Sequence, residues 1–117
     1  MRTQIKKYAH YIKGDVLDIG AGPFDRYSDL FCFSKYIKLD PSPDNNPDII
    51  ASAEKIPLGD NSIDSIVCTQ VLGDVWNLKV AISEFFRVLK SGGNVILTES
   101  LMAAMHDEPH DFWRFTD

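Results

Sequence analysis

Two aspartates, one within an apolar run and one at the end of another, are the residues of this sequence best suited to hold a polar ligand. The first, Asp18, lies within the run Val16–Ile19 and precedes Gly20 and Gly22 in an Asp-x-Gly-x-Gly pattern. Glycines there allow a tight turn and let the backbone approach a ligand more closely than a Cβ would permit. Because a buried carboxylate is costly without a partner, we expect Asp18 to face a cleft, amide groups or a ligand.

The second aspartate, Asp40, ends the run Tyr36–Leu39 and stands twenty residues after Gly20, directly before Pro41. In doubly wound α/β folds an acidic residue at about this distance accepts hydrogen bonds from a ribose diol. An aspartate before a proline also commonly initiates a turn, so this second interpretation stays open. The dinucleotide fingerprint G-x-G-x-x-G is not completed here, which disfavours a nicotinamide-dependent dehydrogenase.

The elements that position these aspartates follow from the spacing of apolar residues. We expect helices over 2–13 and 78–90, a short helix within 25–33, and strands over 15–19, 36–40, 48–51, 63–69 and 94–98. In the helix over 78–90 an apolar stripe faces the sheet, Glu84 and Arg87 pair on the opposite side, and Gly92 and Gly93 end the helix. Alternating strands and helices imply an open, mostly parallel sheet whose ligands lie at the carboxyl ends of its strands.

Five ordered segments resemble class I S-adenosylmethionine-dependent methyltransferases of the methyltransferase type 11-like kind. The Asp-x-Gly-x-Gly turn resembles their first motif, with Phe24 in place of the usual third glycine. The other matching segments are 52–58 (SAEKIPL, against G-D-A-E-x-L-P), 61–67 (NSIDSIV, against N-S-F-D-x-V), 71–75 (VLGDV, against V-L-E-H-V) and 87–93 (RVLKSGG, against R-V-L-K-P-G-G). The departures are Ser52 for Asp, Gly73 and Asp74 for Glu and His, and Ser91 for Pro.

This resemblance implies a Rossmann-like, doubly wound α/β fold, S-adenosyl-L-methionine as the cofactor, and methyl transfer to a small-molecule acceptor. The cofactor-binding residues that it implies are Asp18, Gly20, Ala21, Gly22, Asp40, Pro41, Ala53, Glu54, Gln70, Val71 and Leu72. A catalytically silent cofactor-binding or scaffold protein is the main alternative, and use of the cofactor for a reaction other than methylation is a smaller one.

The segment 106–116 resembles the H-x-x-P-x-D-[FY]-[WY]-R-[FY]-T stretch of some small-molecule methyltransferases. His106 and His110 are the candidate general bases, since their reference pKa lies near ~6.5. Asp111, Trp113 and Arg114 are the candidate acceptor-binding residues. The alternative is a solvated loop held by an Asp–Arg pair and aromatic packing.

The resemblance also sets an expectation about the extent of the domain. The class I fold has seven strands, whereas five are expected in the single domain 1–117, so we expect a methyltransferase domain truncated at its C-terminus. The fifth strand would then form an edge that invites pairing with another chain. We therefore expect either a chain with little activity or a homodimer through this edge.

Net charge, cysteine content and the lengths of apolar runs limit the classes of partner and the cellular compartment that we expect. The net charge of −5 argues against nucleic acid, because binding to phosphates needs clustered basic residues. No metal-ligand spacing is present, and we expect Cys32 and Cys68 to be buried free thiols of a reducing compartment. Without a signal-peptide pattern or an apolar run near ~18 residues, we expect a cytoplasmic protein with no membrane contact.

Overall fold

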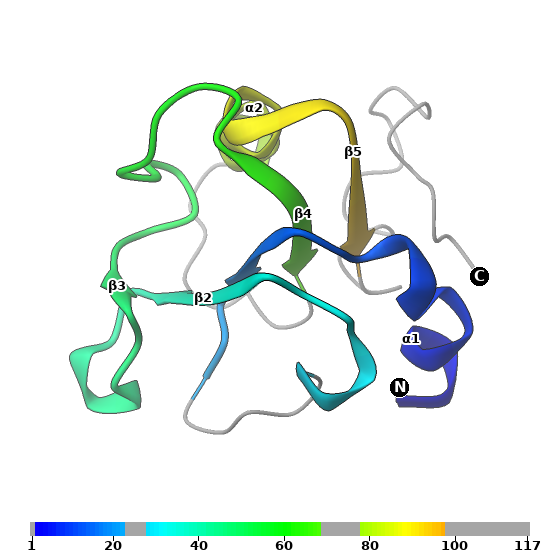
Figure 1. Ribbon diagram of the computed structural model, residues 1–117. Coiled ribbons are helices and arrows are strands. Elements are labelled where there is room, and N and C mark those ends of the chain that lie inside the picture. The colour runs from blue at the N-terminus through cyan, green and yellow to red at the C-terminus, as the bar shows by residue number, and fades with distance from the viewer. Residues whose placement is uncertain (1, 23–27, 69–77, 98–117) are drawn as a thin grey trace.

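A five-stranded parallel sheet forms the centre of the computed structural model, which describes residues 2–22, 28–68 and 78–97 (Figure 1). Its strands are β1 (Asp15–Ile19), β2 (Lys35–Asp40), β3 (Ile49–Ile50), β4 (Ile63–Cys68) and β5 (Leu89–Leu97). They lie in the order β3-β2-β1-β4-β5 and every neighbouring pair is parallel. The chain moves outward from β1 to β3 and then returns to β4, so the switch point lies between β1 and β4. The predicted Rossmann-like α/β class is confirmed.

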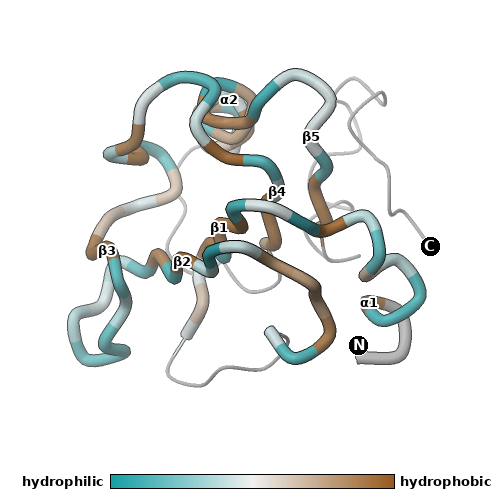
Figure 2. Tube along the Cα trace, viewed as in Figure 1, coloured by the Kyte–Doolittle hydropathy of each residue, from teal (hydrophilic) through white to brown (hydrophobic). Residues whose placement is uncertain are grey.

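The sheet carries a hydrophobic core on each face, because successive residues of a strand point to opposite sides. One core contains Leu17 and Ile19 of β1 and the buried side chains of α2 (Leu78–Val88). The other contains Val16 of β1 and buried residues of α1 (Arg2–Tyr8) and the 3₁₀ helix η1 (Ala9–Tyr11). Figure 2 shows the apolar residues gathered along the strands, with hydrophilic connections around them. Helices α1 and α2 thus cover opposite faces.

Helix α2 ends earlier than the sequence pattern predicts. The prediction of a helix to residue 90, ended by Gly92 and Gly93, is wrong: α2 ends at Val88 and Leu89 already pairs with Ile63 of β4. The backbone N–H of Ser62 donates to the Val88 carbonyl at 2.7 Å, which joins the end of α2 to the start of β4. The predicted strand over 94–98 therefore begins at Leu89, and Gly92, with φ of +83°, lies inside it.

Two smaller corrections concern the first third of the chain. The predicted helix 2–13 is an α-helix to Tyr8 followed by η1. Cys32 is exposed rather than buried, because its neighbour Phe31 takes the buried position and stacks on Tyr36 at 6.4 Å between ring centroids. Cys68 is buried as predicted, and burial, together with the charge of Asp18, raises the pKa of its thiol well above the ordinary value.

Candidate functional site

The turn after β1 brings the predicted glycines against the end of β2. Gly20 and Gly22 have φ of +69° and +75°, the left-handed region that glycine adopts without a steric penalty. The backbone N–H groups of Gly20 and Ala21 both donate to the carbonyl of Leu39, at 2.8 and 3.2 Å. These two hydrogen bonds to the end of β2 therefore hold the turn beside Asp40.

Asp40 is buried at this edge and binds both flanking loops. Its Oδ2 accepts the N–H of Gly22 at 3.0 Å, and its Oδ1 accepts the N–H of Ser42 at 2.9 Å and the amide Nδ2 of Asn45 at 3.0 Å. A carboxylate offers about four acceptor positions, so among the described residues these three bonds leave one on Oδ2. Asp40 thus initiates the turn into η3 (Pro43–Asn45), the alternative left open above, and keeps one acceptor position for a ligand hydroxyl.

Asp18 is also buried, and its carboxylate Oδ2 accepts the phenol hydroxyl of Tyr36 at 2.7 Å. Tyr36 belongs to the core on the α1 side of the sheet. Because residues of a strand alternate between faces, Asp40 lies on the same side of β2 as Tyr36. The two aspartates therefore share one face of the sheet, and nothing in the sequence pattern indicated that Tyr36 would join them.

The segment after β3 continues the same edge. The N–H of Ala51 donates to the carbonyl of Asp40 at 3.1 Å, and Ser52 accepts the N–H of Glu54 on its hydroxyl at 3.1 Å. Ala53 is buried and Glu54 is half-buried. The bond from Ala51 therefore brings the segment that contains Ala53 and Glu54 next to Asp40, although a loop separates them in the sequence.

The structure brings together half of the residues predicted for the site. Those at the carboxyl edge of the sheet are Asp18, Gly20, Ala21, Gly22, Asp40, the exposed Pro41, Ala53 and Glu54. The predicted residues that lie outside the described ranges are Gln70, Val71, Leu72, His106, His110, Asp111, Trp113 and Arg114. Within those ranges, Asn45 and Tyr36 are contacts that the sequence reasoning missed. Asn45 lies in a polar Pro-Asp-Asn-Asn loop after Asp40, a composition that could have drawn attention to it.

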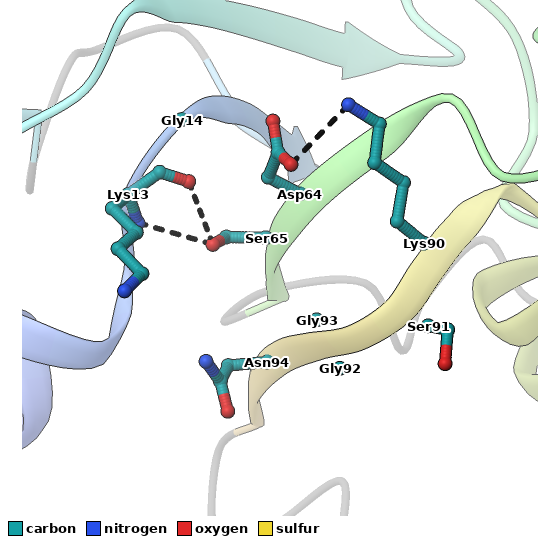
Figure 3. Close-up of a pocket in the computed structure, with 9 residues that line it drawn as sticks. All are labelled: Lys13, Gly14, Asp64, Ser65, Lys90, Ser91, Gly92, Gly93 and Asn94. Atoms are coloured by element: carbon teal, nitrogen blue, oxygen red, sulfur yellow. Dashed lines mark hydrogen bonds and ion pairs between the residues drawn. The ribbon is translucent and has the colours of Figure 1, made fainter.

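A cavity of about 340 Å³ lies at the opposite, amino end of β1, β4 and β5 (Figure 3). The Ser65 hydroxyl donates to the carbonyl of Lys13 at 2.9 Å and accepts its N–H at 3.1 Å. The Asp64 carboxylate accepts the N–H of Asp15 at 2.8 Å and pairs with Lys90 at 3.3 Å. Both side chains bind the start of β1 to β4, so this end of the sheet is bonded internally.

Residues 2–22, 28–68 and 78–97 contain no group of three or more His, Cys, Asp or Glu side chains placed to hold a metal ion. None of the helices they form is both long and apolar enough to cross a membrane.

Solved structures with a similar fold include two whose titles describe S-adenosylmethionine-dependent methyltransferases. The putative S-adenosyl-L-methionine-dependent methyltransferase of Methanococcus maripaludis superposes with a TM-score of 0.68 at 23% identity, over 92% of this chain and 61% of that one. A SAM-dependent methyltransferase of Aquifex aeolicus gives a TM-score of 0.65 at 19% identity, over 81% of this chain and 61% of that one.

Sequence relatives agree with this fold. The ubiquinone/menaquinone biosynthesis C-methyltransferase UbiE of Brucella canis is 34% identical over 74 residues, which are 62% of this chain and 28% of that protein. This chain thus matches little more than a quarter of the length of that curated relative. The methyltransferase domain family matches residues 17–97, from the first aspartate's strand to the end of β5. With the glycine turn, Asp40 and the sheet order in place, this match shows that the chain belongs to the methyltransferase domain family.

Proposed function

We propose that the carboxyl edge of this sheet binds S-adenosyl-L-methionine and that the chain transfers its methyl group to a small-molecule acceptor. The observation that carries the proposal is Asp40, whose Oδ2 keeps an acceptor position next to the Gly22 amide. A ribose hydroxyl can donate to that position without displacing any of the three bonds that Asp40 already makes. The membership of the methyltransferase domain family supports the same assignment.

The charges of this edge suit that cofactor. S-adenosyl-L-methionine carries a sulfonium and an ammonium group, and the buried carboxylates of Asp18 and Asp40 favour positive charge nearby. No basic side chain of the described ranges contacts Asp40, so its charge is not neutralised within them. Ala53 and Glu54, joined to Asp40 through Ala51, are proposed to border the adenine ring.

The chemistry requires orientation more than covalent help from the protein. The bound cofactor supplies a methyl group already activated by its sulfonium. The chain has to hold the cofactor by its ribose and adenine and place an acceptor in line with that methyl group. His106 or His110 is proposed to remove a proton from the acceptor, and Asp111, Trp113 and Arg114 are proposed to bind it.

The UbiE relatives support a small molecule as the acceptor. Their name describes C-methyltransferases of ubiquinone and menaquinone biosynthesis, so a ring carbon of a quinone precursor is the first acceptor to test. The identity covers only part of those proteins, and the acceptor is therefore part of our proposal.

Calorimetric titration tests the binding step directly. We expect heat of binding with S-adenosyl-L-methionine and with its demethylated product, S-adenosyl-L-homocysteine, and none with NAD. A lack of heat with both sulfur compounds would refute the proposal. Transfer of a labelled methyl group to a demethylated quinol then tests catalysis, and binding without transfer to any acceptor screened would favour the silent cofactor-binding or scaffold protein.

We also propose that the chain acts in the cytoplasm, without a nucleic-acid partner, and that it forms a homodimer through the edge of β5. The negative net charge supports the absence of a nucleic-acid partner, because binding to phosphates needs clustered basic residues. Light scattering at several concentrations tests the dimer, and a monomeric mass with full activity would refute it.

A further inference from the structure

Side chains of helix α2 hold the segment from Ala51 to Leu58, and Arg87 makes most of these bonds. The Arg87 guanidinium donates from Nη2 to the carbonyl of Ile56 at 2.7 Å and from Nη1 to the carbonyl of Leu58 at 2.8 Å. It also pairs with the Asp60 carboxylate at 2.8 Å. Arg87 thus bonds to three residues that lie 27 to 31 positions away in the sequence.

Glu84, one turn earlier on α2, completes this attachment. Its Oε1 accepts the N–H of Ile56 at 2.8 Å, and its Oε2 accepts the Nε of Arg87 at 2.6 Å. The N–H and the carbonyl of Ile56 are therefore both bound by the same ion pair. The side chains of Glu84 and Arg87 are only 17% and 32% exposed, so the pair is partly shielded from water.

The other end of the segment is fixed at the candidate cofactor site. The N–H of Ala51 donates to the carbonyl of Asp40, and the Ala53 side chain is buried in the core that α2 also lines. Between these ends the segment pairs with no strand of the described part of the chain, and its own backbone bonds are the short turns Lys55 to Ser52 and Leu58 to Ile56. The ion pair therefore supplies long-range bonds that a strand ladder would otherwise provide.

We propose that Glu84 and Arg87 are positioning residues that hold Ala53 and Glu54 against the adenine end of the cofactor. This inference rests on the proposed binding of S-adenosyl-L-methionine. The predicted pairing of Glu84 with Arg87 is present, and the segment 51–58 bonds to it. An exposed ion pair at i and i+3 contributes little by itself, whereas three of the bonds counted here go to the backbone of the segment that borders the site.

Arg87→Met tests the proposal, with affinity and turnover measured separately. We expect the dissociation constants of S-adenosyl-L-homocysteine and of adenosine to rise by about tenfold, a factor typical of losing hydrogen bonds to a charged group. Because adenosine lacks the amino-acid part, an equal loss for both ligands assigns the effect to the adenine and ribose end. We expect kcat at saturating cofactor to change less than about twofold, since the residues proposed to bind the acceptor belong to a different segment, 106–114.

Two further variants and one control complete the experiment. Arg87→Lys retains a charge and can keep one carbonyl bond, so it should recover part of the affinity. Glu84→Gln keeps the size of the side chain, and we expect a smaller rise, of roughly threefold, from the loss of its charge. The matched control is Lys90→Met, which removes the Lys90–Asp64 ion pair at the amino edge and should leave both dissociation constants unchanged.

The outcomes separate this inference from the proposed function. If wild-type protein binds neither ligand, the proposed function itself fails. If the wild type binds both ligands and Arg87→Met binds them equally well while its melting temperature falls, the ion pair only stabilises the fold and the inference is wrong. A fall in kcat with unchanged affinities would also overturn it. Should Arg87→Met not fold, the Glu84→Gln titration decides.

Discussion

The carboxyl ends and the amino ends of the parallel strands, called here the carboxyl edge and the amino edge of the sheet, are built in a similar way. Each has a carboxylate that accepts a backbone N–H at a glycine turn, and the two carboxylates differ in whether a cation lies beside them. At the carboxyl edge Gly22, with φ of +75°, donates its N–H to Asp40 at 3.0 Å. At the amino edge Gly14, with φ of +71°, precedes the N–H of Asp15, which donates to Asp64 at 2.8 Å. Each edge therefore joins a glycine turn to a carboxylate on a neighbouring strand.

The neighbours of the two carboxylates make the difference. Asp64 has Lys90 at 3.3 Å, a cation that balances its charge within the protein. Within the described ranges the partners of Asp40 are neutral, namely two backbone N–H groups and the amide of Asn45. A carboxylate with a cation beside it is suited to holding strands together, whereas one with neutral donors keeps its charge available to a ligand.

Substitution of Gly14 should have the largest effect on stability. A Cβ at this position would lie 2.5 Å from Oδ2 of Asp64, and the positive φ adds backbone strain. We expect Gly14→Ala to lower the free energy of unfolding by about 2–4 kcal/mol. Urea unfolding measures this, with Gly59→Ala as control, since a Cβ there meets no atom within 4 Å. Equal losses for the two variants would show that the amino edge is not tightly packed.

Removal of each carboxylate separates binding from folding. We expect Asp40→Ala to weaken cofactor binding by roughly 1–3 kcal/mol, the scale of hydrogen bonds to a charged group. Asp64→Ala removes a carboxylate with a similar backbone bond at the other edge, and it should lower the melting temperature while cofactor affinity stays unchanged. Titration and thermal unfolding of both variants make the comparison. Superimposable titration curves for Asp40→Ala and the wild type would refute the ribose assignment.

A smaller effect should appear in the acid range. The hydrogen bond from the Asp15 N–H, with Lys90 adding to it, holds the pKa of Asp64 below its ordinary value. A lowered folded-state pKa contributes stability above the unfolded pKa of about 3.9, and this contribution is lost as the pH falls through the folded-state pKa. We expect the free energy of unfolding to fall below about pH 5, and less steeply in Asp64→Asn.

Urea unfolding at a series of pH values checks this slope. The pKa of Glu84 is also lowered, chiefly by its hydrogen bond from Arg87. Glu84 is present in both proteins, so the difference between the two curves reports Asp64 alone. Parallel curves would mean that the Asp64 carboxylate does not favour the folded state.

The sequence was informative where local pattern and long-range pairing agree. Strand β1 begins and ends where the apolar run and the glycines predicted, and the apolar run before Pro41 correctly placed Asp40 at the end of β2. Both predictions depend on residues whose type restricts the backbone or whose burial needs a partner. The type of such a residue indicates its local structure without knowledge of distant contacts.

The end of α2 could not be predicted in the same way. Leu89 is apolar and fits the buried stripe of a helix as well as a buried strand position, so the pattern does not distinguish the two. The pairing of Leu89 with Ile63 places Leu89 in a strand. These two residues are far apart in the sequence, so the local pattern could not show their contact. The bonds of Arg87 to Ile56 and Leu58 were missed for the same reason.

The different burial of the two cysteines makes thiol labelling a measure of how often the sheet unfolds locally. Cys32 is exposed, while Cys68 lies in the interior strand β4, between β1 and β5, with its thiol held protonated by burial. A thiolate is the species that reacts with alkylating reagents, so Cys32 should be labelled rapidly and Cys68 only when β4 separates from its neighbours. The second labelling event, counted by mass, would therefore report the rate at which the sheet beneath the proposed cofactor site opens.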